Sequence, residues 1–168
     1  HVVTANKALV ASCLPEIAAL LEQHPEVTFN YEAAVCGGIP IITTLQRCYL
    51  GDRITSVMGI MNGTTNFMLS KMEAEGADFG DVLAEAQRLG FAEADPTADV
   101  EGHDVQAKIA LVAKLAYGTT VPVGSIPTMG ISSIGAVDFA YAKQLDATIK
   151  LLGTAKLNAA GDAVSVFV

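Results

Sequence analysis

The chain has 168 residues, of which 51% are hydrophobic and 17% charged, and its formal net charge is −8. This length can bury a real core in one domain with room for part of a second, and the apolar content excludes a disordered chain. The negative charge argues against a nucleic-acid partner, and no apolar run reaches the roughly 18–20 residues that span a bilayer. The three cysteines match no zinc or CxxC spacing, and no secretion signal is visible, so we expect a cytoplasmic protein with reduced thiols.

Both ends of the chain read as apolar strands without a polar leader. The chain opens on His1-Val2-Val3 and closes on 164–168, which look like buried strands. Because a complete domain rarely starts and stops inside its core, the sequence predicts a piece of a longer protein.

Strand-like and helix-like segments alternate along the chain, which favours an α/β or α+β fold. Helices are expected at 15–24, 40–50, 66–75, 79–89, 100–117 and 137–153. Glycines just past four of these segments predict their ends, namely Gly51, Gly76, Gly90 and Gly118. The segment 27–35 is expected to be extended, 53–61 to be a buried strand, and 154–168 to be a hairpin turning at 159–162.

An acidic, Pro- and Gly-broken segment between residues 86 and 108 is the most informative part of the chain. Its carboxylates lead to a single lysine, Lys108, and are Glu93, Asp95, Asp99, Glu101 and Asp104. The ordinary interpretation is a solvated cluster of ion pairs, each worth a few tenths of a kcal/mol. The alternative is a polar binding site with a proton carrier.

Helix phase favours the second interpretation. At about 100° per residue, Lys108 lies near Asp104 and between apolar residues of its own helix, whereas Lys114 falls on a side shared with alanines and is predicted to face solvent. A lysine on the core side needs a partner, because an unpaired buried charge is costly. Asp104 can be that partner, and the pair then becomes a positioned proton carrier.

Two turns are candidate binding elements. Residues 59–65 read as a strand-to-helix turn suited to an anion such as a substrate carboxylate, although Thr64 or Thr65 can simply cap the helix. Glu32 stands near the glycine turn 37–38, whose carbonyl oxygens suit a hard cation, although most such turns bind nothing. No GxGxxG motif occurs, and the three scattered histidines suggest neither a zinc site nor a Ser-His-Asp triad.

The run from Ala86 to Lys108, AQRLGFAEADPTADVEGHDVQAK, closely resembles the signature of homoserine dehydrogenases. The segments VTANK at 3–7, YEAAV at 31–35 with GIPII at 38–42, and GIMNGTTN at 59–66 also resemble that family, in its order. The resemblance covers essentially the whole chain.

The resemblance implies roles for the residues of the acidic segment. Lys108 is expected to be the acid–base residue, and its neighbour Asp104 to orient it and help hold the substrate. Glu93 is expected to bind the substrate amino group, with Asp99 nearby.

It also implies substrate and cofactor contacts elsewhere in the chain. Gly63 and Thr64 are expected to contact the amino-acid end of the substrate, and Lys7 to lie between cofactor and substrate. The family often has Tyr where Phe91 stands, so a hydroxyl contact is lost at that substrate-side position.

A sodium site is implied as well. It is expected at Glu32, Val35, Gly37 and Ile39, mainly through main-chain carbonyls.

In this family a dinucleotide fold that binds NAD(P) is expected before His1, and a Gly-rich C-terminal segment that returns to that fold is expected beyond the residues of this chain. The implied organisation is a remnant of the nucleotide-binding domain and linker at 1–26, followed by the catalytic and dimerisation domain at 27–168, C-terminally incomplete. The implied fold is α/β, with a mixed sheet covered by helices, in the catalytic part of a two-domain dehydrogenase.

The sequence therefore predicts the substrate-binding part of an NAD(P)-dependent enzyme that interconverts L-homoserine and L-aspartate 4-semialdehyde in threonine and methionine biosynthesis. A homodimer is expected, and the fragment alone is expected to be inactive for lack of its cofactor domain. Two alternatives remain. One is a non-catalytic amino-acid-binding module, and the other is a divalent-metal hydrolase with Asp95, Asp99 and Asp104 as ligands.

Overall fold

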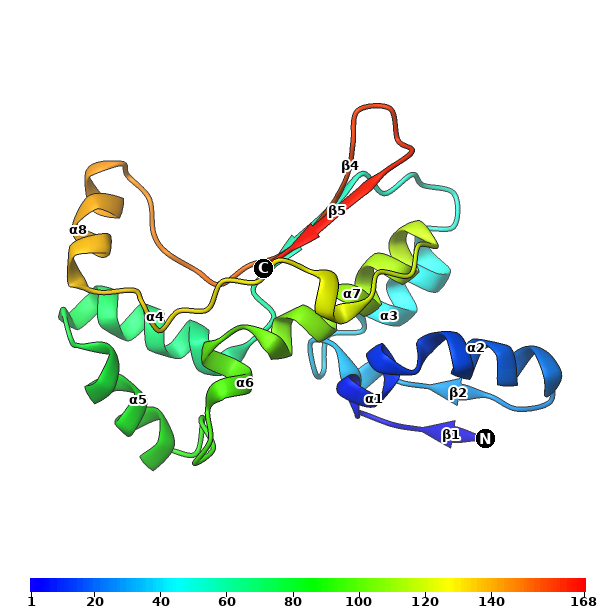
Figure 1. Cartoon of the computed structure of the whole chain (residues 1–168), viewed down its shortest axis with the longest axis horizontal. Coiled ribbons are helices and arrows are strands. Elements are labelled where there is room, and N and C mark those ends of the chain that lie inside the picture. Colours follow the sequence, from blue (N-terminus) through cyan, green and yellow to red (C-terminus); the bar gives the residue numbers. More distant parts are fainter. The chain divides into compact units, whose positions relative to one another are not determined.

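The computed structural model describes all 168 residues. Its helices are α1 (Lys7–Ser12), α2 (Leu14–Gln23), α3 (Ile41–Thr43), α4 (Gly63–Glu75), α5 (Phe79–Arg88), α6 (Thr97–Val100), α7 (His103–Tyr117) and α8 (Ala136–Gln144) (Figure 1). Its strands are β1 (Val2–Val3), β2 (Phe29–Asn30), β3 (Ser56–Gly59), β4 (Gly153–Leu157) and β5 (Val164–Phe167). Short 3-10 turns cover Glu32–Ala34 and Val123–Ser125, and a π-helical turn, Thr44–Cys48, continues α3.

The predicted α/β class is confirmed, with parallel and antiparallel pairing in two small sheets. Strands β1 and β2 pair in parallel, and β3, β4 and β5 form an antiparallel sheet in that order. The closing hairpin is the predicted one, with Leu157 opposite Val164. The chain divides into two compact units. The first comprises His1–Gly59, Gln106–Pro127 and Gly153–Phe167, and the second Ile60–Val105, Thr128–Leu152 and Val168.

In the first unit, the antiparallel sheet buries one face. Val57, Ala155 and Val166 are in register across its three strands, and Ala155 is fully buried. On the other face, Met58 and Phe167 keep 65% and 46% of their surfaces exposed. The prediction of a buried strand at 53–61 is therefore wrong, because only four of those residues form a strand and its two faces differ.

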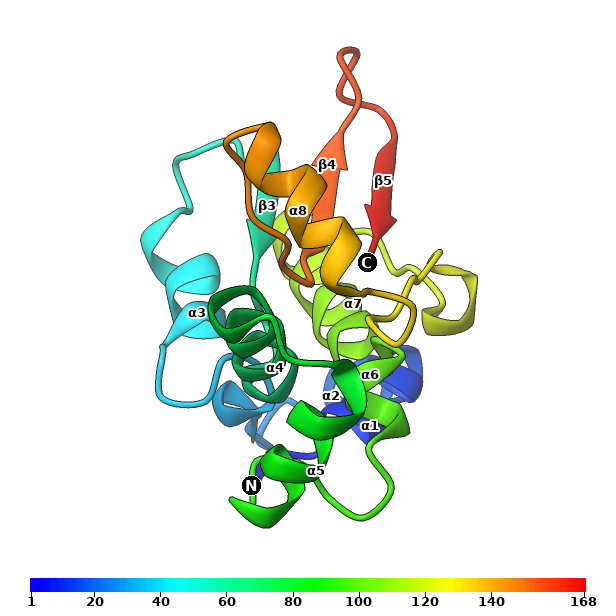
Figure 2. The ribbon, with the colours of Figure 1, turned by 90° about the vertical axis from the view of Figure 1, so that its left-hand side faces the viewer.

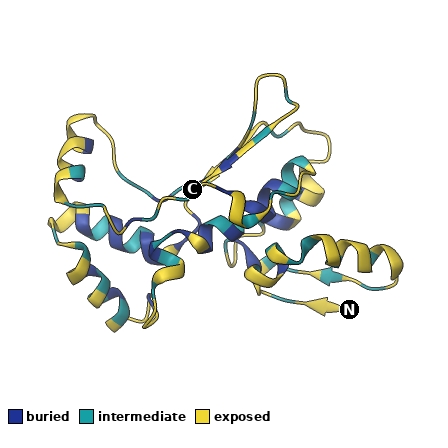
Figure 3. Cartoon of the chain, in the orientation of Figure 1, coloured by how far each residue is buried: buried dark blue, intermediate teal, exposed yellow.

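The N-terminal strand also departs from its prediction. Val2 and Val3 are exposed, since β1 pairs only with β2 and nothing covers its side chains. The closing strand β5 is buried on one side only, at Val166. Figure 3 shows the same contrast among the helices, with α2 largely exposed and α4 and α7 rich in buried residues.

Helix α7, which begins in the second unit and continues in the first, is buried on most of its circumference. Val105, Ile109 and Val112 are fully buried, and the alanines at 107 and 110 are buried as well. The predicted solvent side of this helix is therefore wrong. Both its lysines are half-buried, and the ammonium of Lys114 donates a 2.8 Å hydrogen bond to the carbonyl oxygen of Gly118 at the helix end.

In the second unit, α4 is the central helix and packs against α5, α6 and α8 (Figure 2). Its buried side includes Met68, Leu69 and Met72, and α5 contributes Val82. On the surface, Lys71 joins the two neighbouring helices through ion pairs of 3.1 Å to Glu75 on its own helix and 3.0 Å to Glu85 on α5.

Three helix ends match the glycine signals, whereas two predicted helices have the wrong extent. Gly76, Gly90 and Gly118 follow their helices with φ values of +65°, +79° and +71°, the left-handed region that only glycine adopts readily. The predicted helix 100–117 is instead broken at Gly102 (φ +81°), which separates α6 from α7. The predicted helix 137–153 stops at Gln144, and the following segment is irregular up to β4. No helix is both long and apolar enough to cross a membrane.

Candidate functional site

Two carboxylates of the acidic segment meet on one amide in the second unit. The Nδ2 atom of Asn62 donates a 2.6 Å hydrogen bond to Asp99 Oδ1 and a 3.0 Å hydrogen bond to Asp104 Oδ2. Asn62 and Asp104 keep only 6% and 7% of their surfaces exposed. The break at Gly102 makes this possible, because it turns the chain between α6, which carries Asp99, and α7, which carries Asp104.

The same asparagine begins α4. Its Oδ1 atom accepts hydrogen bonds from Thr65 N (2.8 Å) and Thr65 Oγ1 (3.0 Å), so Asn62 is the N-cap. The alternative that Thr64 or Thr65 caps the helix is therefore wrong. Asn62 could have been found from the sequence, because asparagine is among the strongest N-cap residues and here comes directly after the strand-like run.

The first turn of α4 also holds the loop that carries Phe91. Thr64 Oγ1 donates a 2.7 Å hydrogen bond to the carbonyl oxygen of Phe91, and Thr64 is 8% exposed. The ring of Phe91, itself 55% exposed, packs at 4.9 Å between centroids against Phe67 of α4. Gly63, the first residue of α4, is exposed. The second unit thus brings Gly63, Thr64 and Phe91 together, as a site at this helix start requires.

Two other carboxylates of the segment lie on its exposed loop. The backbone carbonyl of Glu93 accepts a 3.0 Å hydrogen bond from Gln87 Nε2, and the Glu93 residue is exposed. Asp95 Oδ1 accepts a 3.1 Å hydrogen bond from Thr97 N at the start of α6. Hydrogen bonds from the side chain and backbone of Thr97 lower the pKa of Asp95. No three His, Cys, Asp or Glu side chains converge closely enough to hold a metal ion, so the metal-hydrolase alternative loses its ligand set.

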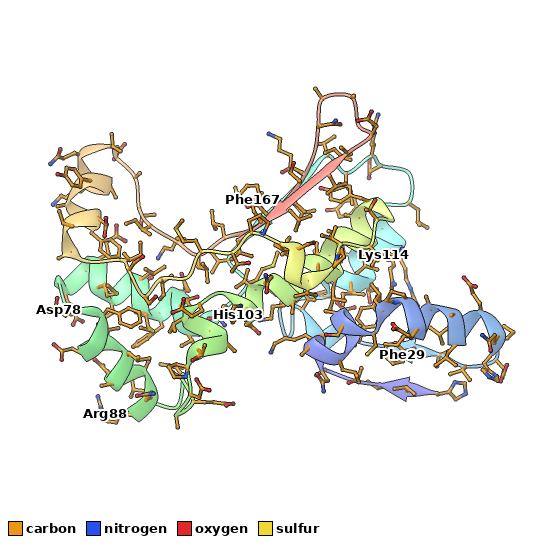
Figure 4. All side chains as sticks on the ribbon, in the orientation of Figure 1. Phe29, Asp78, Arg88, His103, Lys114 and Phe167 are labelled. Carbon is orange, nitrogen blue, oxygen red and sulfur yellow. The ribbon has the colours of Figure 1, made fainter.

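Lys108 belongs to the first unit, one helical turn beyond Asp104 along α7. It is half-buried, and its positive charge acts on the thiol of Cys36. Burial raises the pKa of that thiol, and the charge of Lys108 works in the opposite direction. Figure 4 shows the side chains along this helix, with its first residue, His103, and Lys114 labelled. The three cysteines form no disulfide.

In the predicted sodium segment, the carboxylate of Glu32 accepts hydrogen bonds from the start of α3. Glu32 Oε1 accepts a 2.9 Å hydrogen bond from Ile42 N, and Oε2 accepts one of 2.8 Å from Thr43 N and another from Thr43 Oγ1. Desolvation would raise the pKa of Glu32, but the hydrogen bonds from Thr43 and Ile42 outweigh it and lower that pKa below its usual value. The carboxylate is thus engaged with the backbone at the start of α3, a role that the sequence analysis missed.

The backbone beside Glu32 turns sharply. Cys36 and Gly37 both adopt positive φ angles, of +59° and +57°, Val35 is buried, and Ile39 is 65% exposed. Lys7, the predicted cofactor contact, is the first residue of α1 and is half-buried.

A cavity of about 770 Å³ lies in the second unit, between the C-terminal half of α4 and α8. Its walls include Met72, Gly76, Phe139 and Lys143, and none of the predicted site residues lines it. This cavity is therefore separate from the predicted site residues.

The chain is similar to known proteins over most of its length. The family model described as homoserine dehydrogenase matches residues 40–168. A homoserine dehydrogenase of Synechocystis sp. is 52% identical over 162 residues, which cover 96% of this chain and 37% of that protein. A solved homoserine dehydrogenase from Thiobacillus denitrificans superposes with a TM-score of 0.94 at 46% identity, covering all of this chain and 38% of that one. A hyperthermophilic archaeal homoserine dehydrogenase in complex with NADPH gives a TM-score of 0.78 at 27% identity, covering 98% of this chain and 46% of that one.

These relatives are oxidoreductases, and the fold matches theirs over essentially the whole chain. The chain belongs to the homoserine dehydrogenase family, as the signature segment predicts. It spans about 37% of the length of the Synechocystis relative.

Proposed function

We propose that this chain is the substrate-binding, catalytic part of an NAD(P)-dependent homoserine dehydrogenase, which interconverts L-homoserine and L-aspartate 4-semialdehyde in threonine and methionine biosynthesis. The observation that carries the proposal is the pair of carboxylates, Asp99 and Asp104, held on Asn62 at the start of α4 in a chain of this family. A helix start beside two carboxylates offers both charges that an amino-acid substrate needs.

The amino-acid end of the substrate is assigned to the start of α4 and the loop before α6. The cap on Asn62 uses the N–H of Thr65, so the N–H groups of Gly63 and Thr64 are not used by it and suit the substrate carboxylate. Glu93 and Asp99 are assigned to the substrate ammonium. Phe91 offers its ring at the same place but no hydroxyl group.

Lys108 is assigned the proton transfer. Its ammonium donates a proton to the aldehyde oxygen as the carbonyl is reduced to a hydroxyl, and its neutral amine takes that proton back in the oxidation. Asp104 is assigned to orient Lys108 and to help hold the substrate.

A bound nicotinamide cofactor supplies or accepts the hydride in such a reaction, and one relative is described in complex with NADPH. No GxGxxG turn occurs in this chain. Only Lys7 is assigned to the cofactor, between it and the substrate.

A sodium ion is proposed at the main-chain carbonyls of Val35, Gly37 and Ile39, beside Glu32. Support comes from the two consecutive left-handed residues 36 and 37, which turn successive carbonyls out of a regular path. Because both carboxylate oxygens of Glu32 already accept hydrogen bonds, we expect the carbonyls to provide most of the coordination.

A homodimer and a cytoplasmic location are also proposed. One face of the β3–β4–β5 sheet leaves the apolar side chains of Met58 and Phe167 exposed. Such an exposed apolar face suits contact with a second copy of the chain. The domain boundary at residue 26 stays a prediction.

A non-catalytic amino-acid-binding module is the alternative function. Isothermal titration calorimetry of the full-length protein with L-homoserine and with NADP⁺ separates the two. The proposed enzyme binds both and reduces NADP⁺ when homoserine is added, whereas a module binds homoserine and ignores the nucleotide. Failure to bind homoserine would contradict both functions.

A further inference from the structure

Asn62 uses every hydrogen-bonding group of its side-chain amide, and the uses fall into two sets. The carbonyl oxygen is directed to Thr65 of α4, and the two N–H groups are directed to Asp99 and Asp104. A side-chain amide has only two N–H groups, so neither is left for another partner. The hydrogen bond from Thr65 N also fixes which end of the amide is oxygen. In the reversed orientation, the NH2 group of Asn62 would face the Thr65 N–H, and both groups are donors.

The carboxylates held in this way belong to different helices. Asp99 is on α6 and Asp104 is on α7, and Gly102 lies in a left-handed conformation between them. Two carboxylates close together repel each other, so without a shared donor their side chains would be expected to move apart. The amide of Asn62 is a neutral donor that opposes this separation without cancelling the negative charge.

We propose that Asn62 is a positioning residue for the substrate ammonium: its amide holds Asp99 and Asp104 at a fixed spacing, so that both negative charges act on the ligand together. The inference rests on the proposed function, because it concerns the binding of homoserine at that site. The Asn62 side chain then has two separate roles. Its Oδ1 atom caps α4, and its Nδ2 atom positions the carboxylates of Asp99 and Asp104.

Substitutions that keep the cap but remove the donor test this separation. Asn62→Asp and Asn62→Ser both retain an oxygen able to cap α4, since Asp and Ser are N-cap residues as good as Asn. Neither can donate two hydrogen bonds to the carboxylates at neutral pH. Thr65→Val is the matched control, because it removes the hydroxyl bond to Asn62 Oδ1 while the backbone N–H bond still holds the amide.

The measurement is the dissociation constant of L-homoserine, by calorimetry on the full-length protein between pH 5.5 and 8.5, with the melting temperature of each variant recorded. Loss of hydrogen bonds to charged groups predicts binding about 10- to 100-fold weaker in Asn62→Asp and Asn62→Ser at pH 8. Asn62→Asp should recover part of its affinity relative to wild type at pH 5.5, since its carboxyl group, beside two others, protonates and becomes a donor. Asn62→Ser cannot recover in this way, and Thr65→Val should bind normally at every pH.

Three other outcomes would overturn the proposal. Normal homoserine binding by Asn62→Asp and Asn62→Ser would overturn the positioning role and leave only the helix cap. Failure of both variants to fold would also overturn it, because the residue would then be purely structural. Absence of binding by the wild-type protein would instead contradict the proposed function, and the inference would fall with it.

Discussion

The side chain of Glu32 and the backbone N–H of Ile42, ten residues apart in sequence, form a 2.9 Å hydrogen bond that helps start helix α3. A second carboxylate oxygen accepts from Thr43 N at 2.8 Å. A negative charge at a helix start satisfies N–H groups that have no partner within the helix and interacts favourably with the helix dipole. The residue predicted as a cation ligand therefore has a structural role in the first unit.

We predict that Glu32→Gln lowers the free energy of unfolding by about 1 kcal/mol at pH 7, the typical effect of losing a helix N-terminal acceptor. The amide retains one oxygen but loses the charge and the second acceptor. Urea denaturation of both proteins measures the difference. Glu26→Gln, which changes an exposed glutamate in the same unit, is the control and should leave stability unchanged within about 0.5 kcal/mol.

The pH dependence of this difference has a defined sign. Because folding lowers the pKa of Glu32 from its ordinary value of 4.5, the carboxylate contributes its stabilisation above that pH. The contribution is lost as the pH falls through the lowered folded pKa. The gap between wild type and Glu32→Gln should therefore be full at pH 7 and shrink below about pH 4. A gap that widens in acid would contradict the role of the charge.

Gly130 packs where no side chain fits in the second unit. A Cβ atom there would lie 2.6 Å from Glu101 Cα and even closer to the carbonyl oxygen of Val100, and backbone atoms cannot move aside cheaply. The adjacent Ile131 N–H donates a 2.7 Å hydrogen bond to that same carbonyl. We predict that Gly130→Ala destabilises the protein by about 1–3 kcal/mol, as overpacking does.

Thermal unfolding of Gly130→Ala beside Gly124→Ala checks this. A Cβ at Gly124 meets nothing within 4 Å, so the control variant should melt close to wild type. Because Gly130 contacts the corner between α6 and α7, its substitution should also weaken homoserine binding. Equal melting temperatures for the two variants would show that the corner is not rigid.

Thr64 joins the start of α4 to the loop that carries Phe91 through a 2.7 Å hydrogen bond. We predict that Thr64→Val costs about 0.5–1.5 kcal/mol of stability, since it leaves the Phe91 carbonyl without that donor, and raises the KM for homoserine. Thr64→Ser keeps the hydroxyl group and should retain the KM of wild type. A KM that rises equally in both variants would show that the methyl group, not the hydroxyl, matters.

Local signals in the sequence predicted the elements well where one residue type decides the conformation. Glycines that adopt left-handed angles ended α4 and α7 as expected, at Gly76 and Gly118. The antiparallel hairpin followed from two apolar strands around a short polar turn. The irregular segment after α8 was not predicted, because 145–153 keeps a helix-like apolar pattern although Asp146 turns left-handed (φ +51°).

The roles that depend on long-range contacts could not be predicted from the sequence. Glu32 meets α3 across a turn, and Asn62 meets Asp99 across 37 positions, so neither role follows from nearest neighbours. Helix phase predicted that Lys108 lies on a buried side of α7, and Lys108 is half-buried. It also predicted that Lys114 faces solvent, which is wrong, because Ala107 and Ala110 on the same side are buried and Lys114 is itself half-buried. The candidate site itself came from the family resemblance more than from any periodicity.

We propose that Lys108 carries the proton in homoserine dehydrogenation. Lys108→Ala should lower kcat by about 10²–10⁴-fold, the usual contribution of general acid–base catalysis, while the affinity for NADP⁺ stays nearly unchanged. Lys114→Ala is the matched control. That lysine is also half-buried on α7, but its ammonium donates a hydrogen bond to the carbonyl oxygen of Gly118 at the end of the helix.

The most direct measurement is the rate of NADPH oxidation with L-aspartate 4-semialdehyde by the full-length wild type and both variants. We expect turnover in wild type and Lys114→Ala and its near-complete loss in Lys108→Ala, with all three proteins folded. Near-normal turnover by Lys108→Ala would contradict it.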